Sequence, residues 1–298
     1  MRIVAIVNPI SGAGMDADAS ARRVAMIRDV LRRRGFEASI RVTERAGHAR
    51  ELAEGAVEDR ADLVIVWGGD GTVNEAGAGL VGSPVALGLI PAGSGNGLAA
   101  ALGVPRDPHA ALSAALDGRV RSVDVGTLNG RAFFNVAGIG FDAHVARLFN
   151  QRARGRRGRL PYVFIGITEG CRYAGLTYTV RFTGDSPGCA SAHKALLIAF
   201  ANGSEYGMGM RIAPAARPDD GLLEACIVAD RPVLSRFLHA RHFAFGSIDS
   251  APGLLRRSVR GATVEAPGEI VYHLDGEPGA AEGRVEIAIR PASLRVKA

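Results

Sequence analysis

The chain has 298 residues, of which 47% are hydrophobic and 22% are charged, and its formal net charge is +6. This composition is normal for a soluble globular protein with one large or two ordinary domains. No apolar run approaches the roughly 18 residues that a helix needs to cross a bilayer, which excludes a protein that spans the membrane with helices. Met1 leads directly into an apolar run, so we expect no signal peptide. Three scattered cysteines predict reduced thiols in a cytoplasm rather than a disulfide framework: Cys171, Cys189 and Cys226.

The first 120 residues alternate between apolar runs and amphipathic segments, as βα units do. We predict strands at residues 3–7, 36–42, 62–67 and 85–90. We predict helices at residues 16–34, 47–59 and 72–80, the first with an apolar face at Val24, Ile27 and Leu31. Parallel strands joined by helices form an α/β sheet, which binds ligands at the carboxyl ends of its strands. The glycine-rich turns of this half all fall at those ends.

After about Val120 the pattern changes to short strands separated by turns. Strands are predicted at residues 122–128, 132–137, 177–182, 195–201, 222–228, 261–265, 270–274 and 285–289. Two helices interrupt them, at residues 161–173 and 232–245. This order predicts a second, mainly antiparallel β domain of sandwich type. A cleft between two such domains is a natural place for an active site.

Positive charge is concentrated in one segment. Residues 143–168 contain no acid and six arginines, Arg147, Arg152, Arg154, Arg156, Arg157 and Arg159. These six charges equal the net charge of the chain. Such a patch suits an anionic membrane surface or nucleic acid, and a solvated loop explains it equally well. Nucleic acid is the weaker partner because few aromatic residues lie among the arginines.

The loop after the first strand, residues 8–14, reads Asn-Pro-Ile-Ser-Gly-Ala-Gly. Ser11, Gly12 and Gly14 can form a loop that binds phosphate through its backbone. A structural turn explains the segment nearly as well. It is not a Walker loop, because no lysine follows the glycines, and it lacks the glycine spacing of a dinucleotide-binding motif.

The most informative segment is Gly68-Gly69-Asp70-Gly71-Thr72, which follows the third strand and precedes a helix. Glycines let the backbone approach a ligand closely, and the N–H groups at the start of a helix attract phosphate. An acid inside a phosphate-binding turn implies a cation or a proton transfer. The segment therefore predicts phosphoryl chemistry, with a helix-capping aspartate as the alternative.

Two further segments also follow predicted strands. Residues 93–97, Gly-Ser-Gly-Asn-Gly, lie one βα unit further along and can line the same crevice. Residues 275–277, Asp-Gly-Glu, place two acids around a glycine. Because Asp-Gly is a strong hairpin signal, an ordinary turn is the better explanation of this last segment when it is taken alone.

Together and in this order, the four segments resemble the diacylglycerol kinase catalytic family, which includes sphingosine kinases, ceramide kinases and bacterial lipid kinases. The resemblance covers nearly the whole chain, and its most specific part is Gly-Gly-Asp-Gly-Thr-x-Asn-Glu at residues 68–75. It implies an α/β ATP-binding kinase domain at residues 1–120 and a β-sandwich lipid-acceptor domain at residues 121–298, with the active site in the interdomain cleft. In similar proteins the tail, here from about Val285, packs back on the first domain.

The resemblance also implies the roles of the site residues. Asp70 would hold the catalytic Mg²⁺, a cation that prefers carboxylates, water and phosphate oxygens. The base that accepts the proton of the lipid hydroxyl would be Glu277, with Asp275 as its competitor. The implied nucleotide contacts are Asn8, Ser11, Gly12, Thr43, Gly68, Gly69, Asp70, Gly71, Thr72, Asn74, Glu75, Ser94 and Asn96.

A second cation is implied by the segment Arg217-Pro218-Asp219-Asp220-Gly221-Leu222, which matches a structural Mg²⁺ site of bacterial relatives. Its ligands here would be the Asp220 carboxylate and the backbone carbonyls of Arg217 and Leu222. An acidic turn before a strand is an equal alternative.

The chain departs from the family pattern near the acceptor or phosphate site. Where the family often has threonine, aspartate and arginine, this chain has Ser94, Gly97 and Ala100. Serine keeps the hydroxyl, whereas the other two changes remove a charged pair. The loop at residues 8–14 also lacks a basic residue near Gly14. These departures leave the identity of the acceptor open.

We therefore predict an ATP- and Mg²⁺-dependent lipid kinase that phosphorylates the hydroxyl of a diacylglycerol- or sphingoid-like lipid. It would act in the cytoplasm at the inner face of the membrane, docked on anionic lipid through its arginines and without a nucleic-acid partner. A homodimer is left open. Two alternatives stand: an NAD kinase-like enzyme, which shares the Gly-Gly-Asp-Gly element, and a nucleotide-binding regulatory protein without kinase activity.

Overall fold

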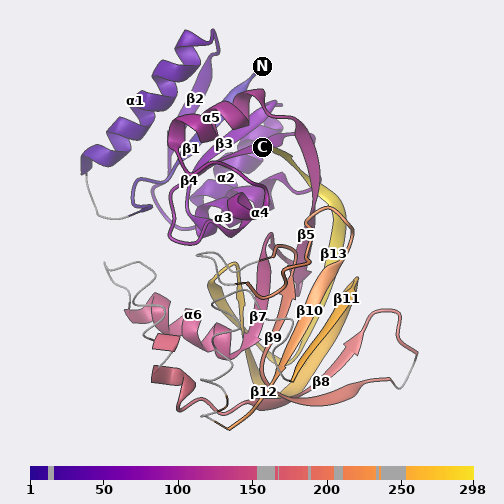
Figure 1. The fold of residues 1–298 in the computed structure, drawn as a ribbon. Coiled ribbons are helices and arrows are strands. Elements are labelled where there is room, and N and C mark those ends of the chain that lie inside the picture. Colours follow the sequence, from indigo (N-terminus) through magenta and orange to yellow (C-terminus); the bar gives the residue numbers. More distant parts are fainter. Residues whose placement is uncertain are drawn as a thin grey trace. The chain divides into compact units, whose positions relative to one another are not determined.

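The computed structural model describes residues 1–12, 17–152, 165–166, 168–186, 189–204, 211–232, 235 and 253–298. The chain forms two compact units (Figure 1). Unit 1 comprises Met1–Val123 and Ala292–Ala298, and unit 2 comprises Asp124–Pro291. Several predicted features lie outside the described residues, namely Gly14, most of the helix predicted at 232–245, and Arg154, Arg156, Arg157 and Arg159 of the arginine cluster.

Unit 1 is a parallel α/β sheet. Its strands include β1 (Ile3–Val7), β2 (Ala38–Val42), β3 (Leu63–Gly68) and β4 (Ala86–Pro91). Its helices include α1 (Ala17–Arg33), α2 (His48–Glu58), α3 (Asp70–Leu80), α4 (Gly97–Ala101) and α5 (Pro108–Asp117). The strand order is β4-β3-β1-β2, and each neighbouring pair is parallel. β1 and β3 are buried along their whole length, which is why they read in the sequence as unbroken apolar runs.

The central strands of unit 1 end level with one another. Val7 of β1 lies opposite Trp67 of β3, which in turn lies opposite Ile90 of β4. The loops that follow these three strands therefore start side by side, at the carboxyl edge where α/β sheets bind ligands.

Unit 2 is mainly antiparallel β structure. Its strands are β5 (Val120–Leu128), which begins in unit 1, and β6 (Arg131–Phe133), β7 (Val136–Gly140), β8 (Leu176–Phe182), β9 (Ser191–Ala201), β10 (Leu223–Ala229), β11 (Leu254–Val259), β12 (Gly261–Leu274) and β13 (Glu277–Lys297). β7 pairs with β9 and β12, and β8 pairs with the same two strands further along. The core between the strands includes Phe133, Tyr178, Phe200, Leu274 and Val285. The predicted fold class, an α/β domain followed by a β-sandwich-like domain, is confirmed.

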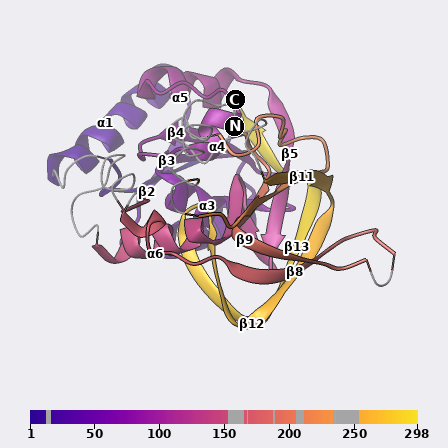
Figure 2. The ribbon, with the colours of Figure 1, turned by 60° about the horizontal axis from the view of Figure 1, so that its bottom comes forward.

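A helix directly after residue 140 was not among the predicted elements. Helix α6 (Phe141–Arg152) stands there and packs against β7, β9 and β12 (Figure 2). Its buried face consists of small or β-branched residues, Ala143, Val145 and Ala146. Such a face gives a weak helical signal in a sequence, because the apolar stripe is short and the flanking arginines dominate the composition.

The last seven residues belong to unit 1. Arg295 to Lys297 of β13 pair in parallel with β4, next to Ala86 and the residues that follow it. The side chains of Leu294 and Val296 are buried, and Lys297 Nζ donates to the Leu116 carbonyl at 2.6 Å. These residues add a fifth parallel strand to the sheet of unit 1.

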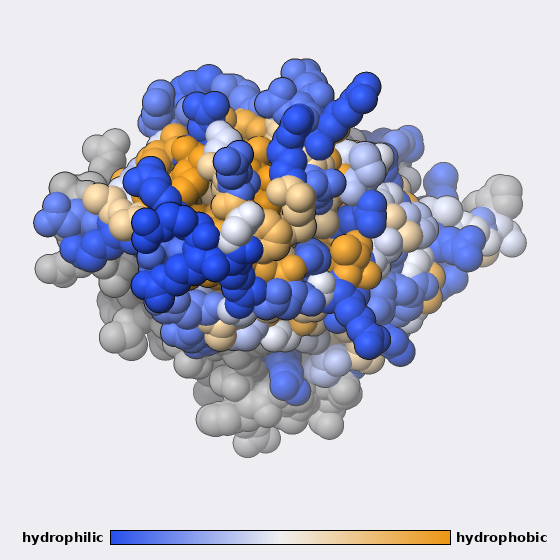
Figure 3. Space-filling model, turned by 90° about the horizontal axis from the view of Figure 1, so that it is seen from above, coloured by the Kyte–Doolittle hydropathy of each residue, from blue (hydrophilic) through white to orange (hydrophobic). Residues whose placement is uncertain are grey.

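No helix in the described part of the chain combines the length and the hydrophobicity that crossing a bilayer requires. The end of unit 1 near the chain termini is shown in Figure 3, where hydrophobic residues gather in the middle of the face and hydrophilic residues surround them. The described part of this unit exposes four large apolar side chains: Ile10 at 57%, Met1 at 48%, Val120 at 43% and Val42 at 36%.

Leu294→Ala is expected to lower the free energy of unfolding of unit 1 by about 2–5 kcal/mol, because it leaves a cavity beside β4. Arg295→Ala, whose exposed side chain faces the other way, is the matched control and should cost well under that amount. Urea unfolding followed by Trp67 fluorescence measures both. Equal losses in the two variants would mean that the tail does not contribute to the core of unit 1.

Candidate active site

Asp70 joins two of the loops at the carboxyl edge of unit 1. It is the first residue of α3, and its carboxylate reaches across to the loop after β4. Oδ2 accepts the Asn96 N–H at 2.8 Å, and Oδ1 accepts the Gly97 N–H at 2.7 Å. Each carboxylate oxygen can accept a further hydrogen bond or a cation, so both bonds are compatible with metal binding.

The same two loops touch through their backbones. A Cβ on Gly93 would lie 2.8 Å from the Gly69 Cα, so position 93 has no room for a side chain, and a Cβ on Gly69 would lie 3.2 Å from the Gly93 Cα. Asn96, in the left-handed conformation at φ 56°, closes its own loop: its amide accepts the Gly93 N–H at 2.8 Å and donates to the Gly93 carbonyl at 2.7 Å. The asparagine that the sequence assigned to nucleotide contact thus also shapes the loop.

The loop after β1 is tied to the Gly-Gly-Asp-Gly-Thr segment by a pair of side chains. Asn8 Nδ2 donates to Thr72 Oγ1 at 2.7 Å, and Asn8 Oδ1 accepts the Ile10 N–H at 3.0 Å. A Cβ on Gly68 would lie 2.6 Å from the Thr72 Cβ, so glycine is required there for Thr72 to take this position. The hydroxyl of the buried Thr72 therefore anchors the loop after β1 through Asn8.

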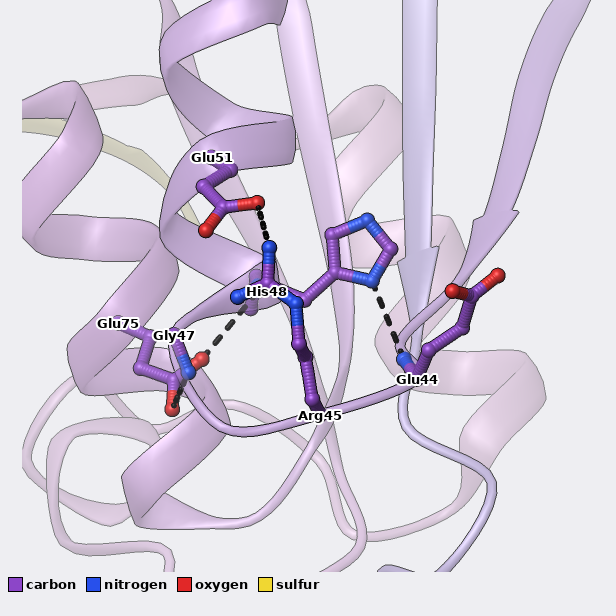
Figure 4. A network of polar contacts seen from close by, with 7 residues as sticks. Glu44, Arg45, Gly47, His48, Glu51 and Glu75 are labelled. Atoms are coloured by element: carbon purple, nitrogen blue, oxygen red, sulfur yellow. Dashed lines mark hydrogen bonds and ion pairs between the residues drawn. The ribbon is translucent and has the colours of Figure 1, made fainter.

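Glu75 lies away from these loops and holds the start of α2 (Figure 4). Its carboxylate accepts the N–H groups of Gly47 at 2.8 Å and Ala49 at 3.2 Å, where a negative charge also complements the helix dipole. Close by, the Glu44 N–H donates to His48 Nδ1 at 3.1 Å. Glu75 thereby fixes the segment after β2, the segment that also carries Thr43.

In unit 2, the segment Asp275-Gly276-Glu277 forms the tight turn between β12 and β13. Positive φ angles at Asp275 (50°) and Gly276 (90°) are those of a type I′ hairpin turn. The Asp275 carboxylate accepts three backbone N–H groups at 2.8–3.0 Å, those of Phe134, Asn135 and Val136. Glu277 is exposed, and among the described residues no hydrogen bond or ion pair engages its side chain. The two acids of the segment thus have different surroundings.

Comparison with known families accounts for both units. The diacylglycerol kinase catalytic domain model matches residues 2–128, and the YegS C-terminal NAD kinase beta sandwich-like domain model matches residues 135–298. The chain belongs to the diacylglycerol kinase catalytic family. Within this family it is similar to the YegS-like lipid kinases, so the prediction of a lipid kinase is confirmed at that level.

Relatives and solved structures match most of the chain. The probable lipid kinase YegS-like of Pectobacterium atrosepticum is 31% identical over 279 residues, which is 90% of this chain and 88% of the relative. The protein of the same name from Chromohalobacter salexigens is 37% identical over 66% of this chain and 64% of its own length. Three solved chains from Bacillus anthracis, one described as a diacylglycerol kinase, have TM-scores of 0.80, 0.79 and 0.72 at 21–22% identity. They cover 99% of this chain and 94–96% of their own lengths, and they show the fold.

Arg23 of α1 contacts the loop after β1, and the sequence did not predict this contact. Its guanidinium donates to the Asn8 carbonyl at 2.6 Å, to Ser11 Oγ at 2.9 Å and to the Ser11 carbonyl at 2.5 Å. It also lies over the Trp67 ring, 5.6 Å from the centroid, and burial lowers its pKa. The signal in the sequence is an arginine four residues before Ile27, on the buried stripe of an amphipathic helix.

The other predicted nucleotide contacts lie mostly at the same edge. Gly12 has a φ of 98°, and a Cβ there would be 3.2 Å from the Ala92 carbonyl, so the first loop also meets the loop after β4. Thr43 follows β2, where its N–H donates to the Val7 carbonyl at 2.9 Å. Ser94 is exposed, and Asn74 is half-buried on α3. The structure therefore brings these residues together, with Glu75 as the one that faces α2.

The segment predicted to bind a structural cation is held by a buried acid that the sequence did not single out. Asp124 is 2% exposed; its Oδ2 accepts the Gly221 N–H at 2.7 Å, and its N–H donates to the Pro218 carbonyl at 2.7 Å. Asp220 Oδ1 accepts the Leu222 N–H at 3.0 Å. A carboxylate and backbone carbonyls are the kinds of donor that Mg²⁺ prefers, so the predicted ligands have suitable chemistry and the cation stays a prediction. Clusters of three or more His, Cys, Asp or Glu side chains suited to a metal do not occur among the described residues.

Asp275→Asn is expected to lower the free energy of unfolding by about 1–3 kcal/mol, because the new amide places N–H groups against a backbone donor. The control is Glu282→Gln on the exposed face of β13, which should change it by no more than about 0.5 kcal/mol. Chemical unfolding measures both variants. A neutral Asp275→Asn would show that the three backbone contacts do not stabilise the turn.

Arg23→Ala is expected to expose the ring of Trp67, which is 6% exposed in the folded chain and is the sole tryptophan. The fluorescence of Trp67 should shift to the red and become more accessible to acrylamide, with a stability loss of about 1–3 kcal/mol. Arg32→Ala removes a side chain that is 79% exposed on the same helix and should leave both readouts unchanged. Unaltered quenching in Arg23→Ala would contradict this placement of the guanidinium.

Proposed function

We propose that the chain transfers the γ-phosphoryl group of ATP to the hydroxyl of a lipid alcohol of the diacylglycerol or sphingoid class, with Mg²⁺ as the required cation. The observation that carries the proposal lies at the carboxyl edge of the sheet of unit 1. There Asp70, at the start of α3, links the loops after β3 and β4. Family membership narrows the acceptor to a lipid rather than NAD.

The donor side of the proposal rests on α3. A helix leaves its first N–H groups without intrahelical partners, and those groups attract phosphate. α3 presents them at the same edge as the Asn8 and Ser11 loop, which Arg23 holds in place through three hydrogen bonds. The chain thus orients the phosphates with backbone donors and a rigid loop.

Asp70 would hold the cation on this side, and Asp220 with the carbonyls of Arg217 and Leu222 would hold a structural one in unit 2. When bound at the donor site, Mg²⁺ supplies neutralisation of the charge on the phosphate oxygens. Asp70 itself does two things: it holds the loop after β4 and places a negative charge next to the phosphates. That charge repels a phosphate unless a cation offsets it.

Glu277 is the proposed base. Its carboxylate is exposed at the first position of β13, whereas the Asp275 oxygens already accept three backbone N–H groups. A carboxylate that the fold does not use can accept the proton of an attacking hydroxyl. We therefore assign proton acceptance to Glu277 and an anchoring role to Asp275.

The lipid acceptor places the reaction at a membrane surface, on the cytoplasmic side in our proposal. Arg147 is the member of the arginine cluster whose side chain the structure describes; it is half-exposed and lies 3.6 Å from Glu269. A weak exposed ion pair of this kind leaves the arginine able to meet an anionic headgroup. Docking through the whole cluster stays a prediction.

Purified chain with Mg²⁺ and ATP labelled in its terminal phosphate should phosphorylate one of a panel of acceptors: diacylglycerol, a sphingoid base, ceramide and a polyprenol. NAD belongs in the same panel, and labelled NADP would overturn the proposal in favour of an NAD kinase. Tight ATP binding without transfer to any acceptor would favour a regulatory protein instead.

Glu277→Gln should reduce kcat on the active acceptor by about 100- to 10,000-fold, because the amide cannot accept the proton. The KM for ATP and the melting temperature should stay unchanged, since the side chain is exposed. Glu282→Gln, on the same strand, is the matched control and should retain wild-type turnover. If Glu277→Gln keeps its turnover, the base is a different residue.

A further inference from the structure

A buried histidine and a buried aspartate lie beneath the turn that carries Glu277. The side chains of His273 on β12 and Asp142 on α6 are 3% and 7% exposed, and His273 Nε2 is 3.3 Å from Asp142 Oδ2. Burying two polar side chains costs free energy unless they are hydrogen-bonded. The proposed reaction gives no role to His273 or Asp142.

The contacts of the imidazole define its tautomer. The Gly276 N–H donates to His273 Nδ1 at 3.2 Å, so Nδ1 carries no proton. Nε2 then carries the proton and donates it to Asp142 Oδ2. Asp142 Oδ1 in turn accepts the Ala143 N–H at 2.8 Å, at the start of α6. A line of hydrogen bonds thus connects the turn to the first residues of α6.

The neighbouring strand makes room for this pair. Gly138 of β7 lies opposite His273, and a Cβ at position 138 would be 2.0 Å from Asp142 Oδ2 and 2.5 Å from His273 Nε2. No side chain fits there while the pair is in place. The arrangement therefore depends on residues of three elements, β7, β12 and α6.

A second contact fixes the backbone carbonyl of Gly276. Asn150, two turns further along α6, donates from Nδ2 to the Gly276 carbonyl at 3.2 Å. α6 thus holds the N–H of Gly276 through the histidine and the carbonyl of Gly276 through Asn150. The Asp275 carboxylate holds the preceding residue of the turn against residues 134–136. Glu277 is the next residue, so its backbone starts from a point fixed on both sides.

We propose that His273, Asp142 and Asn150 are positioning residues that fix the direction in which Glu277 leaves the turn. This inference rests on the proposed function, in which Glu277 is the base. The side chain of Glu277 is exposed and has no partner among the residues that the structure describes. Its direction therefore depends on the backbone of Gly276. A displacement of the base by about 1 Å can cost up to about 100-fold in rate, which is the effect that these three residues prevent.

His273→Leu removes the hydrogen bonds of the imidazole to Gly276 and Asp142, whereas His273→Asn keeps an acceptor near the position of Nδ1 for the Gly276 N–H. The Leu variant is expected to lose kcat by about 10- to 100-fold while the KM for ATP changes by no more than about threefold. The Asn variant should recover most of the lost kcat. His109→Leu, the same substitution at an exposed position, is the control and should match the wild type.

Asn150→Ala tests the same idea without touching the core, because Asn150 is exposed on α6. Its kcat should fall by about 3- to 10-fold with an unchanged melting temperature. A purely structural role of the pair predicts something else: lower melting temperatures, no rescue by His273→Asn, and full turnover in Asn150→Ala. That outcome, or full turnover in a folded His273→Leu variant, overturns the inference.

A readout that needs no turnover separates this inference from the proposed function. The ¹⁵N shifts of the His273 ring should report a neutral imidazole protonated at Nε2, and the Gly276 amide should exchange slowly in the wild type and quickly in His273→Leu. If no acceptor is phosphorylated, the proposed function fails, and these two signals still decide whether the histidine fixes the turn. An imidazole protonated at Nδ1, or equal Gly276 exchange in both proteins, refutes the positioning role.

Discussion

The carboxylate of Asp70 is the group on which the donor half of the molecule depends. Its bonds to the N–H groups of Asn96 and Gly97 join two loops whose glycines, Gly69 and Gly93, meet at backbone distance. Hydrogen bonds to an ionised group are stronger than neutral ones, and the start of α3 favours a negative charge. The Asp70 carboxylate, which joins the two loops, therefore also places a negative charge at the carboxyl edge of the sheet. In the proposed reaction the phosphate groups of the nucleotide would meet this negative charge, so a cation that offsets it would be required.

Capture of backbone N–H groups by an acid recurs throughout the chain. Glu75 holds the start of α2, Asp124 holds the turn at Gly221, and Asp275 holds the segment before β7. Each bond joins segments that are far apart in sequence and costs little side-chain entropy, because these side chains are short or half-buried. Glu277 is the exception among the acids of the four motifs, since no contact of its carboxylate occurs within the described part of the chain. Acids of similar appearance in the sequence thus divide into those that hold backbone N–H groups and the one that we propose as the base.

The fold was largely predictable, whereas the anchoring of the site was not. The buried strands of unit 1 appear as apolar runs that end in glycine turns, and these runs set the sheet and its carboxyl edge. β13 was predicted only at residues 285–289, because Pro278, Gly279 and Gly283 are typical of turns rather than of a long strand. The partners of Asp70 and Asp275 are backbone N–H groups 26 and 141 residues away. Every residue except proline has such a group, so no side-chain pattern marks the donor. Arg23 was missed for a related reason, since two of its three bonds go to backbone carbonyls.

The departure of this chain from the family pattern near residue 97 can now be interpreted physically. The family often has an aspartate where this chain has Gly97, yet the contact with Asp70 is made by the backbone N–H of that residue. The loop after β4 is therefore anchored regardless of the side chain at this position. Loss of the aspartate and of the arginine at Ala100 removes charge from the loop without loosening it, because the closure by Asn96 and the approach of Gly93 to Gly69 remain. The two departures therefore bear on what the loop can contact, and the anchoring that Asp70 provides is independent of them.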